Sequence, residues 1–384
     1  MHICIDARMF SPKFTGIGRY THELVKQFLL LKPNWKFTLF LNKKQYDAFT
    51  LEINNNSAYA KIDIELFIAD ETIYSLQEQT TFLQKLNKID ANIFWFPHFN
   101  VPYFFNKNFI VTVHDLTLSK FPGKKMNSFI HRFVYFKILR HALQKSKHIL
   151  TVSENTKTDI ITDEKINKDK ITIAYNAVGN EFFEYNKSIN YEDFEKLEAK
   201  FSIKKSQYFL YTGQHREHKN IITLVKAFHK FITQQDNNTF KLILTGKENP
   251  LYTEVNNYIE LHGLKKSIIL TGLVSETELL SLYKNAKCYI FPSLYEGFGI
   301  PPLEAMAMNT PVIASNAACI PEICEDAAIY FNSKDENMLA QKMQDIVQNK
   351  WLVEKLIASG KNQLEKYDWK KSARIIIKKF EEFS

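Results

Sequence analysis

Residues 287–315 read KCYIFPSLYEGFGIPPLEAMAMNTPVIAS and contain the pattern of one β-loop-α-β unit. Two short runs, KCYIFPS (287–293) and PVIAS (311–315), predict buried strands because they are apolar, rich in β-branched or aromatic residues, and bounded by turn residues. Between them, Pro301 and Pro302 fit the first turn of a helix, where a backbone N–H group has no helical partner to lose. Such a unit is the building block of an α/β domain with a parallel sheet.

The same alternation of short apolar runs and longer helical stretches continues along the chain. In the first half, the predicted strands are residues 2–6, 36–41, 62–67, 92–96, 109–113, 148–152 and 171–175. In the second half, they are residues 208–213, 240–246, 267–272, 287–293 and 311–315. We therefore expect an α/β protein with these parts: a first domain at 1–185, a charged connection at 186–207, a second domain at 208–365 and a final helix at 366–384.

Length and composition agree with two intracellular domains. A chain of 384 residues exceeds the size at which one hydrophobic core usually stops growing. The first residues, MHICID, enter a predicted strand at once, which argues against a secretory signal, and no apolar run approaches the roughly 18 residues of a membrane span. The cysteines lack CxxC spacing and are expected to be reduced and buried, as in a cytosolic protein; they are Cys4, Cys288, Cys319 and Cys324.

Positive charge is concentrated in the first half of the chain. The formal net charge is +8, and residues 1–180 contain 24 Lys and Arg against 16 Asp and Glu, whereas residues 181–384 contain 26 of each. Residues 116–153 contain eight basic side chains and no acidic one. We expect one of the two halves to face something anionic.

Three predicted strands of the second half end in the dipeptide Thr-Gly, at Thr212-Gly213, Thr245-Gly246 and Thr271-Gly272. These dipeptides are predicted to mark the carboxyl edge of one sheet, where ligands bind in open α/β sheets and glycine lets a ligand approach the backbone. Ser275 and Glu278 form a capping box, which predicts a helix directly after Gly272.

The segment EGFGIPPLE, residues 296–304, predicts an anion site at a helix start. Free N–H groups are expected at Phe298, Gly299 and Ile300, and the helix dipole there favours a phosphate. Glu296 precedes this start, and Glu304 is expected in the first helical turn. Taken alone, Glu304 fits equally well an acid that stabilises the helix dipole. Two acids together with two glycines and two prolines favour a ligand site.

The segment GQHREHKN, residues 213–220, crowds basic side chains into a loop between a strand and a helix. Such a loop is often only a solvated surface. At the ligand edge of the sheet, it is better explained as a clamp for a diphosphate, with Lys219 as a compact charge and Arg216 as a planar fork.

The segment TGIGRY, residues 15–20, places Gly16 and Gly18 before a predicted helix. A dinucleotide-binding fingerprint would have a third glycine at the position of Thr21, so that interpretation is disfavoured. A plain turn is the other simple interpretation. A glycine pair that opens a helix still suits a phosphate.

The segment VTVHDL, residues 111–116, ends a buried-type strand with His114 and Asp115. A single histidine is usually structural, but its place at a strand end favours a site role.

Several chemistries lack their motifs in this sequence. No D-x-D pair, HExxH, G-x-S-x-G or Walker lysine is present. These absences disfavour D-x-D-type metal-bridged sugar-nucleotide binding, zinc proteolysis, esterase chemistry and P-loop phosphoryl transfer.

The motifs together resemble a known family. TGIGRY, TVHDL, TVSENTKTDI, GQHREHKN, EGFGIPPLEAMAMNTPVIASN and IPEICEDAA, in this order, are similar to the retaining GT-B glycosyltransferases of family 4. Within that family, the resemblance is to the subset that transfers mannose or rhamnose in bacterial O-antigen and capsule synthesis. It implies a GT-B fold, in which two Rossmann-like domains face each other across a cleft and the C-terminal helix crosses back to the first domain.

The resemblance also implies roles for matching residues. The second domain would hold the nucleotide-sugar donor: Glu304 would bind the ribose hydroxyls, Glu296 the transferred sugar, and Lys219 the diphosphate together with the N–H groups of residues 298–300. Leu273 and Val274 would border the base. In the first domain, which would bind the acceptor, His114 would touch the sugar near the reacting carbon and Gly16 would close over the phosphates.

One position departs from the family pattern. Many members have an arginine after the glycine that matches Gly213, and Gln214 stands there in this sequence. Either Arg216 or His218 is expected to supply part of that charge.

The basic stretch at 120–148 predicts a second partner. Residues 126–144 are expected to form a helix with Phe129, Phe133, Phe136 and Leu143 near one face. Burial of that face against the sheet is one interpretation, but it leaves the basic excess unexplained. A basic amphipathic surface suits an anionic leaflet or a lipid diphosphate, so we expect a cytoplasmic enzyme peripheral to the inner membrane. No nucleic-acid-binding module accompanies the charge.

The leading hypothesis is a metal-independent transferase that moves mannose from GDP-mannose to a polyprenyl-diphosphate-linked or oligosaccharide acceptor, without a cofactor. Alternatives are a transferase of rhamnose, GlcNAc or glucose, an inactive scaffold of the same fold at the membrane, and a sugar-nucleotide epimerase. Fixed positive charge and helix N–H groups can stabilise a nucleoside diphosphate as it leaves, which makes transfer without a metal chemically reasonable.

Overall fold

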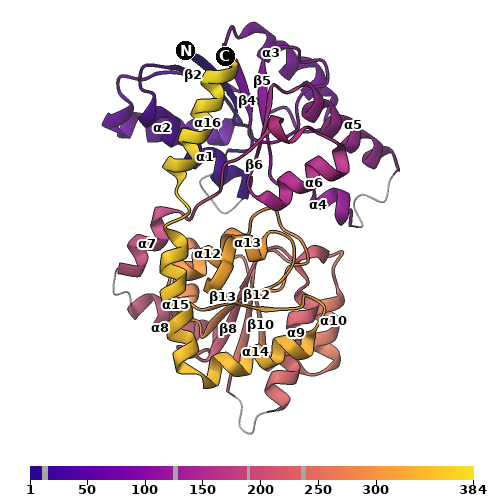
Figure 1. The fold of residues 1–384 in the computed structure, drawn as a ribbon. Helices are drawn as coiled ribbons and strands as arrows, with labels where there is room; N and C mark the ends of the chain where they lie inside the picture. Colours follow the sequence, from indigo (N-terminus) through magenta and orange to yellow (C-terminus); the bar gives the residue numbers. More distant parts are fainter. Residues whose placement is uncertain (11–15, 124–128, 188–190, 235–238) are drawn as a thin grey trace. The chain divides into compact units, whose positions relative to one another are not determined.

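The computed structural model describes residues 1–10, 16–123, 129–187, 191–234 and 239–384 (Figure 1). The chain divides into two compact units. The first unit consists of Met1–Leu116, Lys125–Asn176 and Asp368–Ser384, and the second of Thr117–Lys124 and Ala177–Tyr367. Both units are α/β and are built on parallel sheets, which confirms the predicted fold class.

The first unit contains a seven-stranded sheet in the order β3-β2-β1-β4-β5-β6-β7. Its strands are β1 (His2–Asp6), β2 (Lys36–Leu41), β3 (Asp63–Ile68), β4 (Ile93–Phe96), β5 (Phe109–Val113), β6 (His148–Thr151) and β7 (Ile171–Ile173). Its α-helices are α1 (Gly16–Leu31), α2 (Lys43–Asn55), α3 (Leu83–Lys88), α5 (Phe129–Lys145), α6 (Glu154–Glu164) and α16 (Trp369–Phe383). Short helical turns add η1 (Ser57–Tyr59), η2 (Glu78–Phe82) and η4 (Lys168–Lys170).

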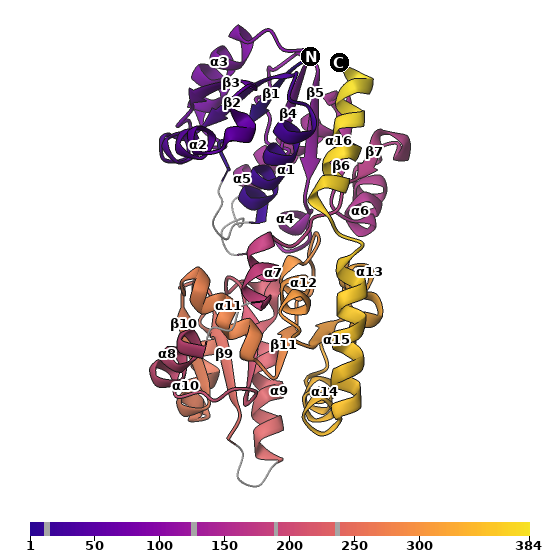
Figure 2. The same cartoon turned by 90° about the vertical axis from the view of Figure 1, so that its left-hand side faces the viewer.

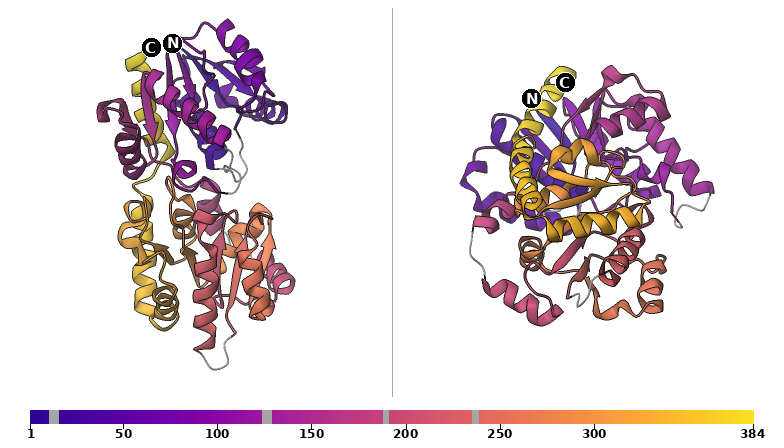
Figure 3. Two further views of the ribbon diagram at one scale, coloured as in Figure 1. Left: turned by 90° about the vertical axis from the view of Figure 1, so that its right-hand side faces the viewer. Right: turned by 60° about the horizontal axis from the view of Figure 1, so that its bottom comes forward.

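The second unit contains a six-stranded sheet in the order β10-β9-β8-β11-β12-β13, with helices on both faces (Figure 3). Its strands are β8 (Tyr208–Thr212), β9 (Lys241–Thr245), β10 (Ile268–Gly272), β11 (Cys288–Phe291), β12 (Val312–Ser315) and β13 (Ala328–Phe331). Its α-helices are α4 (Thr117–Lys120), α7 (Asn180–Lys187), α8 (Tyr191–Phe201), α9 (Ile221–Thr233), α10 (Glu254–Leu261), α11 (Glu276–Asn285), α12 (Ile300–Ala307), α13 (Ile320–Cys324), α14 (Glu336–Gln348) and α15 (Lys350–Leu364). The short turns are η5 (Glu217–Lys219), η6 (Leu264–Lys266) and η7 (Glu325–Ala327).

The segment expected as a connection, 186–207, belongs to the second unit. It contains α8, which packs against α11, so its charged residues cover a domain surface. The chain passes from one unit to the other after residues 116, 124, 176 and 367.

Sequence patterns also missed β13, because this edge strand is short and its middle residues are only half-buried.

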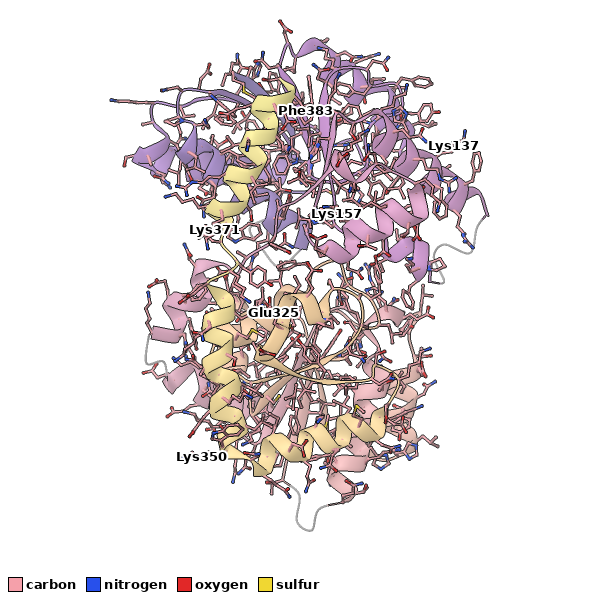
Figure 4. All side chains as sticks on the ribbon, viewed as in Figure 1. Lys137, Lys157, Glu325, Lys350, Lys371 and Phe383 are labelled. Carbon is pink, nitrogen blue, oxygen red and sulfur yellow. The ribbon has the colours of Figure 1, made fainter. Side chains whose placement is uncertain are left out.

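The C-terminal helix packs on the first unit, which confirms the expected return of the chain. Helix α16 lies beside α1 (Figure 2). The Phe380 ring lies 5.4 Å from that of Phe28, and Phe383, at the end of α16 (Figure 4), stacks on His148 at 5.2 Å. Residues from the two ends of the sequence therefore share one core.

The three Thr-Gly dipeptides do lie at one sheet edge, because β8, β9 and β10 are adjacent and parallel. Gly213 N–H donates to the Thr245 carbonyl, and Gly246 N–H donates to that of Gly272, both at 2.9 Å. Gly246 has a φ of 134°, and a Cβ atom there would lie 2.0 Å from the Gly213 carbonyl oxygen. Glycine is thus required at Gly246 because the strand ends approach one another closely.

The four cysteines are free and buried, as predicted. Among the residues that the structure describes, no helix has the length and apolar character needed to span a membrane.

Candidate functional site

The turn from β11 into α12 forms the centre of the site in the second unit. Gly299 caps the helix with a φ of 92°, and a Cβ atom there would press on the Phe291 ring at 3.2 Å. Pro301 and Pro302 follow Ile300 in the first turn. Prolines carry no N–H group, so the free donors of this helix start are concentrated at Gly299 and Ile300.

Glu304 lies one position beyond its predicted place. The helix begins at Ile300, before the proline pair, so the first turn contains no acid and Glu304 falls in the second. Its role as a dipole-stabilising acid is weakened, because the dipole effect fades beyond the first turn. Glu304 is buried, and its Oε2 accepts a hydrogen bond from the Tyr283 hydroxyl at 3.0 Å.

The structure brings Lys219 and Glu296 together, at 2.6 Å between Nζ and Oε1. Lys219 ends the turn after β8 and Glu296 lies in the loop after β11, and these strands are neighbours. The side chains are 20% and 13% exposed. Each side chain therefore neutralises the charge of the other, and both are partly accessible to a ligand.

Asn220 was not predicted as a site residue, yet it fixes the loop that carries Lys219. Its backbone is left-handed, with a φ of 54°, and its side-chain amide donates to the carbonyls of Pro292 and Ser333 at 3.0 and 2.7 Å. The Leu294 N–H donates to the His218 carbonyl at 2.7 Å. The signal in the sequence was an asparagine, which tolerates this conformation, directly before a helix.

Cys319 supports the same loop from the other side. Its buried Sγ lies 3.2 Å from the carbonyl oxygens of Glu296 and Phe298. Burial raises the pKa of the Cys319 thiol well above its usual range. The thiol therefore keeps its proton and remains a donor that the two carbonyls share.

The remaining residues predicted to bind the donor differ in exposure. Phe298 is buried, Arg216 is exposed, and Leu273 is 78% exposed at the end of β10, followed by the half-buried Val274. Arg216 and His218 were the two residues expected to supply the charge that is missing at Gln214. His218 is buried, so of these two only Arg216 presents its side chain to solvent. These assignments remain predictions.

His114 lies in the first unit, directly after β5. Its Nε2 donates to the Pro97 carbonyl at 2.8 Å, so Nδ1 is left as an acceptor in the neutral ring. Burial lowers the pKa of His114 below its ordinary value. The ring is therefore neutral at pH 7.

Two predicted motifs of the first unit meet at this histidine. The Tyr20 ring stands edge-on to His114 at 4.7 Å, and Tyr20 follows Gly16 and Gly18 in α1. Gly16 is exposed and Gly18 is buried. Thr15, the first residue of that motif, lies outside the described residues.

A second histidine, His98, was not predicted and lies near His114. The Asn100 N–H donates to its Nδ1 at 3.1 Å. Burial, with a smaller contribution from His114, lowers the pKa of His98 to about 3. Its signal in the sequence was a position two residues after β4, at the same sheet edge.

Helix α5 differs from the predicted amphipathic pattern. Phe133 was expected on the apolar face, but it is 54% exposed. The buried face consists of Tyr135, Ile138, Leu139, Ala142 and Leu143, while Phe136 is half-buried. The prediction was therefore wrong for Phe133 but confirmed for Leu143, which is fully buried, and Phe136 packs against the same core. Residues 124–128 and the side chain of Phe129 lie outside the described part.

Within the described ranges, no group of three or more His, Cys, Asp or Glu side chains is placed to hold a metal ion. The charged side chains among the residues predicted to bind the donor are Lys219, Glu296, Glu304 and Arg216.

Two family models match most of the chain between them. One, described as Glycosyltransferase Family 4, matches residues 14–182. The other, described as Glycosyl transferases group 1, matches residues 193–363.

Individual proteins also match. The chain is 32% identical over 273 residues to the O-antigen chain mannosyltransferase RfbU of Salmonella typhimurium, covering 71% of this chain and 68% of that protein. It is 26% identical over 376 residues to O-antigen chain mannosyltransferase B of Escherichia coli, covering 96% of each. Anabaena HepE, crystallised with UDP and glucose, has a similar fold, with a TM-score of 0.74 at 14% identity over 99% of both chains.

The low pKa of His98 predicts acid sensitivity of the first unit. An unfolded histidine takes up a proton as the pH falls through about 6.5, whereas folded His98 does so only near 3. Stability that is present above pH 6.5 is therefore lost progressively below it. We expect His98→Asn, whose carboxamide keeps an acceptor for the Asn100 N–H, to reduce the fall in thermal midpoint between pH 7 and pH 5 by about 3 °C.

The measurement is differential scanning calorimetry of both proteins at matched ionic strength. His262→Asn is the control, because its site lies in the second unit. Equal falls in midpoint for His98→Asn and the wild type would contradict the expectation.

Proposed function

The chain belongs to the family 4 glycosyltransferases of the GT-B fold, and from this premise we propose that it transfers mannose from GDP-mannose with retention of configuration and without a metal. The acceptor is a lipid-linked or oligosaccharide chain of a bacterial O-antigen. The names of the relatives RfbU and mannosyltransferase B support mannose and O-antigen.

The observation that carries the proposal is the Lys219–Glu296 pair beside the start of α12. The donor's diphosphate occupies the helix start, where Gly299 and Ile300 offer N–H groups and Lys219 adds a positive charge. Glu296 then turns from Lys219 to hydroxyls of the sugar, and Glu304 binds the ribose. The fixed donors stabilise the charge that develops on the leaving nucleoside diphosphate.

In the reaction, the bond between C1 of mannose and the diphosphate oxygen breaks, and an acceptor hydroxyl oxygen bonds to C1 on the same face. The hydroxyl proton passes to the departing diphosphate. In this arrangement Glu296 is engaged with hydroxyls of the sugar, and no carboxylate is assigned to C1 as a covalent nucleophile. The proposed step is therefore same-face attack and not a double displacement.

His114 contributes a neutral acceptor to this reaction. Its Nε2 proton is committed to the Pro97 carbonyl, so Nδ1 accepts a hydrogen bond from a hydroxyl of the transferred sugar. Because the ring is neutral, it adds no positive charge beside a sugar carbon that itself becomes positive in the transition state.

The basic helix α5 supports a second proposal, docking to the cytoplasmic face of the inner membrane. Phe133 and Val134 are exposed, and Lys137 lies over the Phe133 ring at 5.6 Å. Lys137 projects outward at the edge of the first unit (Figure 4). Aromatic side chains beside lysine suit the interface of an anionic leaflet.

The donor is tested with a panel of GDP-mannose, UDP-glucose, UDP-GlcNAc, dTDP-rhamnose and ADP-glucose in the presence of EDTA. GDP-mannose at 100 times its Kd should add about 2.7 kcal/mol to the free energy of unfolding, seen as a rise in thermal midpoint. The other sugars should add much less at the same concentration. Selective stabilisation by a UDP sugar, or a response only after Mg²⁺ is added, would overturn the donor or the metal independence.

Glu296→Gln should separate catalysis from nucleotide binding. The variant loses the charge that contacts the sugar, so we expect kcat to fall about a hundredfold. GDP lacks the sugar, and Lys219 is released from its pair, so the affinity for GDP should not fall. Calorimetric titration with GDP and a radiolabelled mannose-transfer assay measure the two quantities. A large loss of GDP affinity with an unchanged kcat would reverse the assigned role.

Lys137→Glu should weaken flotation with vesicles that contain anionic lipid by about five- to thirtyfold, because each well-placed charge contributes about 1 kcal/mol. The matched control is Lys355→Glu, since Lys355 also lies over an exposed aromatic ring, that of Trp351 at 5.5 Å, in the second unit. Equal binding by both variants, or binding that ignores anionic lipid, refutes docking through α5.

A further inference from the structure

Three hydroxyl groups line up behind Glu304 in the core of the second unit. The Tyr283 hydroxyl lies 3.0 Å from Oε2 of Glu304, and Thr212 Oγ1 lies 2.7 Å from the Tyr283 hydroxyl. The Tyr289 hydroxyl lies 3.1 Å from the same Thr212 oxygen. Both tyrosines are fully buried and Thr212 is 9% exposed. The series therefore lies out of reach of bulk water.

The chemistry of the groups gives the series a direction. A carboxylate carries no proton, so Tyr283 donates to Glu304. This commits the single phenolic proton of Tyr283, so the Thr212 hydroxyl donates to Tyr283. The Tyr289 hydroxyl then donates to Thr212, whose Oγ1 lies 3.1 Å away and whose carbonyl oxygen lies 3.4 Å away. Burial raises the pKa of Tyr283 well above its ordinary value, and the Glu304 charge adds to this effect. Tyr283 therefore stays protonated and remains a donor.

The backbone holds Tyr283 in register with α12. Thr310 Oγ1 donates to the Tyr283 carbonyl at 2.6 Å, and the Thr310 N–H donates to the Ala305 carbonyl at 2.9 Å. One threonine thus joins α11, which carries Tyr283, to α12, which carries Glu304. The backbones from which the two side chains extend are thereby held together.

We propose that Tyr283 is a positioning residue that fixes the Glu304 carboxylate for the ribose hydroxyls of the donor, with Thr212 and Tyr289 as its support. The inference rests on the ribose role of Glu304 in the proposed function. A carboxylate held by a buried donor has its rotamer set before the nucleotide arrives, so it can accept from the ribose hydroxyls without first being ordered. Tyr283 itself does not touch the ligand.

The test compares the affinities for GDP and 2′-deoxy-GDP by isothermal titration calorimetry. The wild type should prefer GDP by about tenfold or more, because the deoxy nucleotide lacks one hydroxyl that donates to the charged Glu304 carboxylate. Tyr283→Phe keeps the ring and removes the donor, so this preference should fall to about threefold or less, with GDP itself bound more weakly. In the transfer assay, KM for the donor should rise while kcat changes by less than about twofold.

Tyr208→Phe is the matched control. Tyr208 is fully buried, belongs to β8, and its hydroxyl donates to the Leu282 carbonyl in α11 at 2.7 Å. It therefore joins the same strand and helix as the Thr212–Tyr283 contact without reaching Glu304. This variant should keep the wild-type preference for GDP even where it loses stability.

Thr212→Val tests the same inference if Tyr283→Phe fails to fold. It removes the donor to Tyr283 at nearly constant volume, and an intermediate preference is expected. A wild-type preference in both Tyr283→Phe and Thr212→Val overturns the positioning role. Glu304→Gln separates this failure from that of the proposed function: if it too keeps the wild-type preference, the ribose assignment of Glu304 itself is wrong.

Discussion

The left-handed turn at Gly299 is the constraint on which the candidate donor site depends. A side chain there would meet both an unfavourable φ of 92° and the Phe291 ring, so the chain can leave β11 and enter α12 at this angle only with glycine. Prolines directly after Ile300 then commit the next residues to the helix and remove two N–H groups. The turn thereby decides where Glu296, Glu304 and the remaining helix donors lie.

Electrostatics of the site follow from that turn and from its neighbour after β8. Lys219 and Glu296 neutralise each other at 2.6 Å in the protein without ligand. An isolated lysine or glutamate in this partly buried position would be costly. A ligand with both an anionic group and hydroxyl groups can take the place of Glu296 beside Lys219 and the place of Lys219 beside Glu296. The pair therefore favours a diphosphate sugar over a simple anion.

The sequence was most informative where local chemistry decides the structure. Apolar runs located nearly all strands, and Thr212, Thr245 and Thr271, each followed by glycine, correctly marked the edge shared by β8, β9 and β10. Contacts between distant residues were not visible. Tyr283 looked like an ordinary core tyrosine, although it bonds a residue 21 positions away. Phe133 looked buried because helical periodicity shows that a face exists, while tertiary packing decides which face it is.

The packing of α16 on the first unit also affects when that unit can finish folding during synthesis. Phe380 covers Phe28 and Trp95, yet it is translated after every residue of the second unit. The first unit must therefore hold an unfinished apolar surface until α16 emerges. Synthesis at about 5–20 residues per second makes that wait many seconds long. The half of the chain that is synthesised first is therefore the half that receives its last helix at the very end.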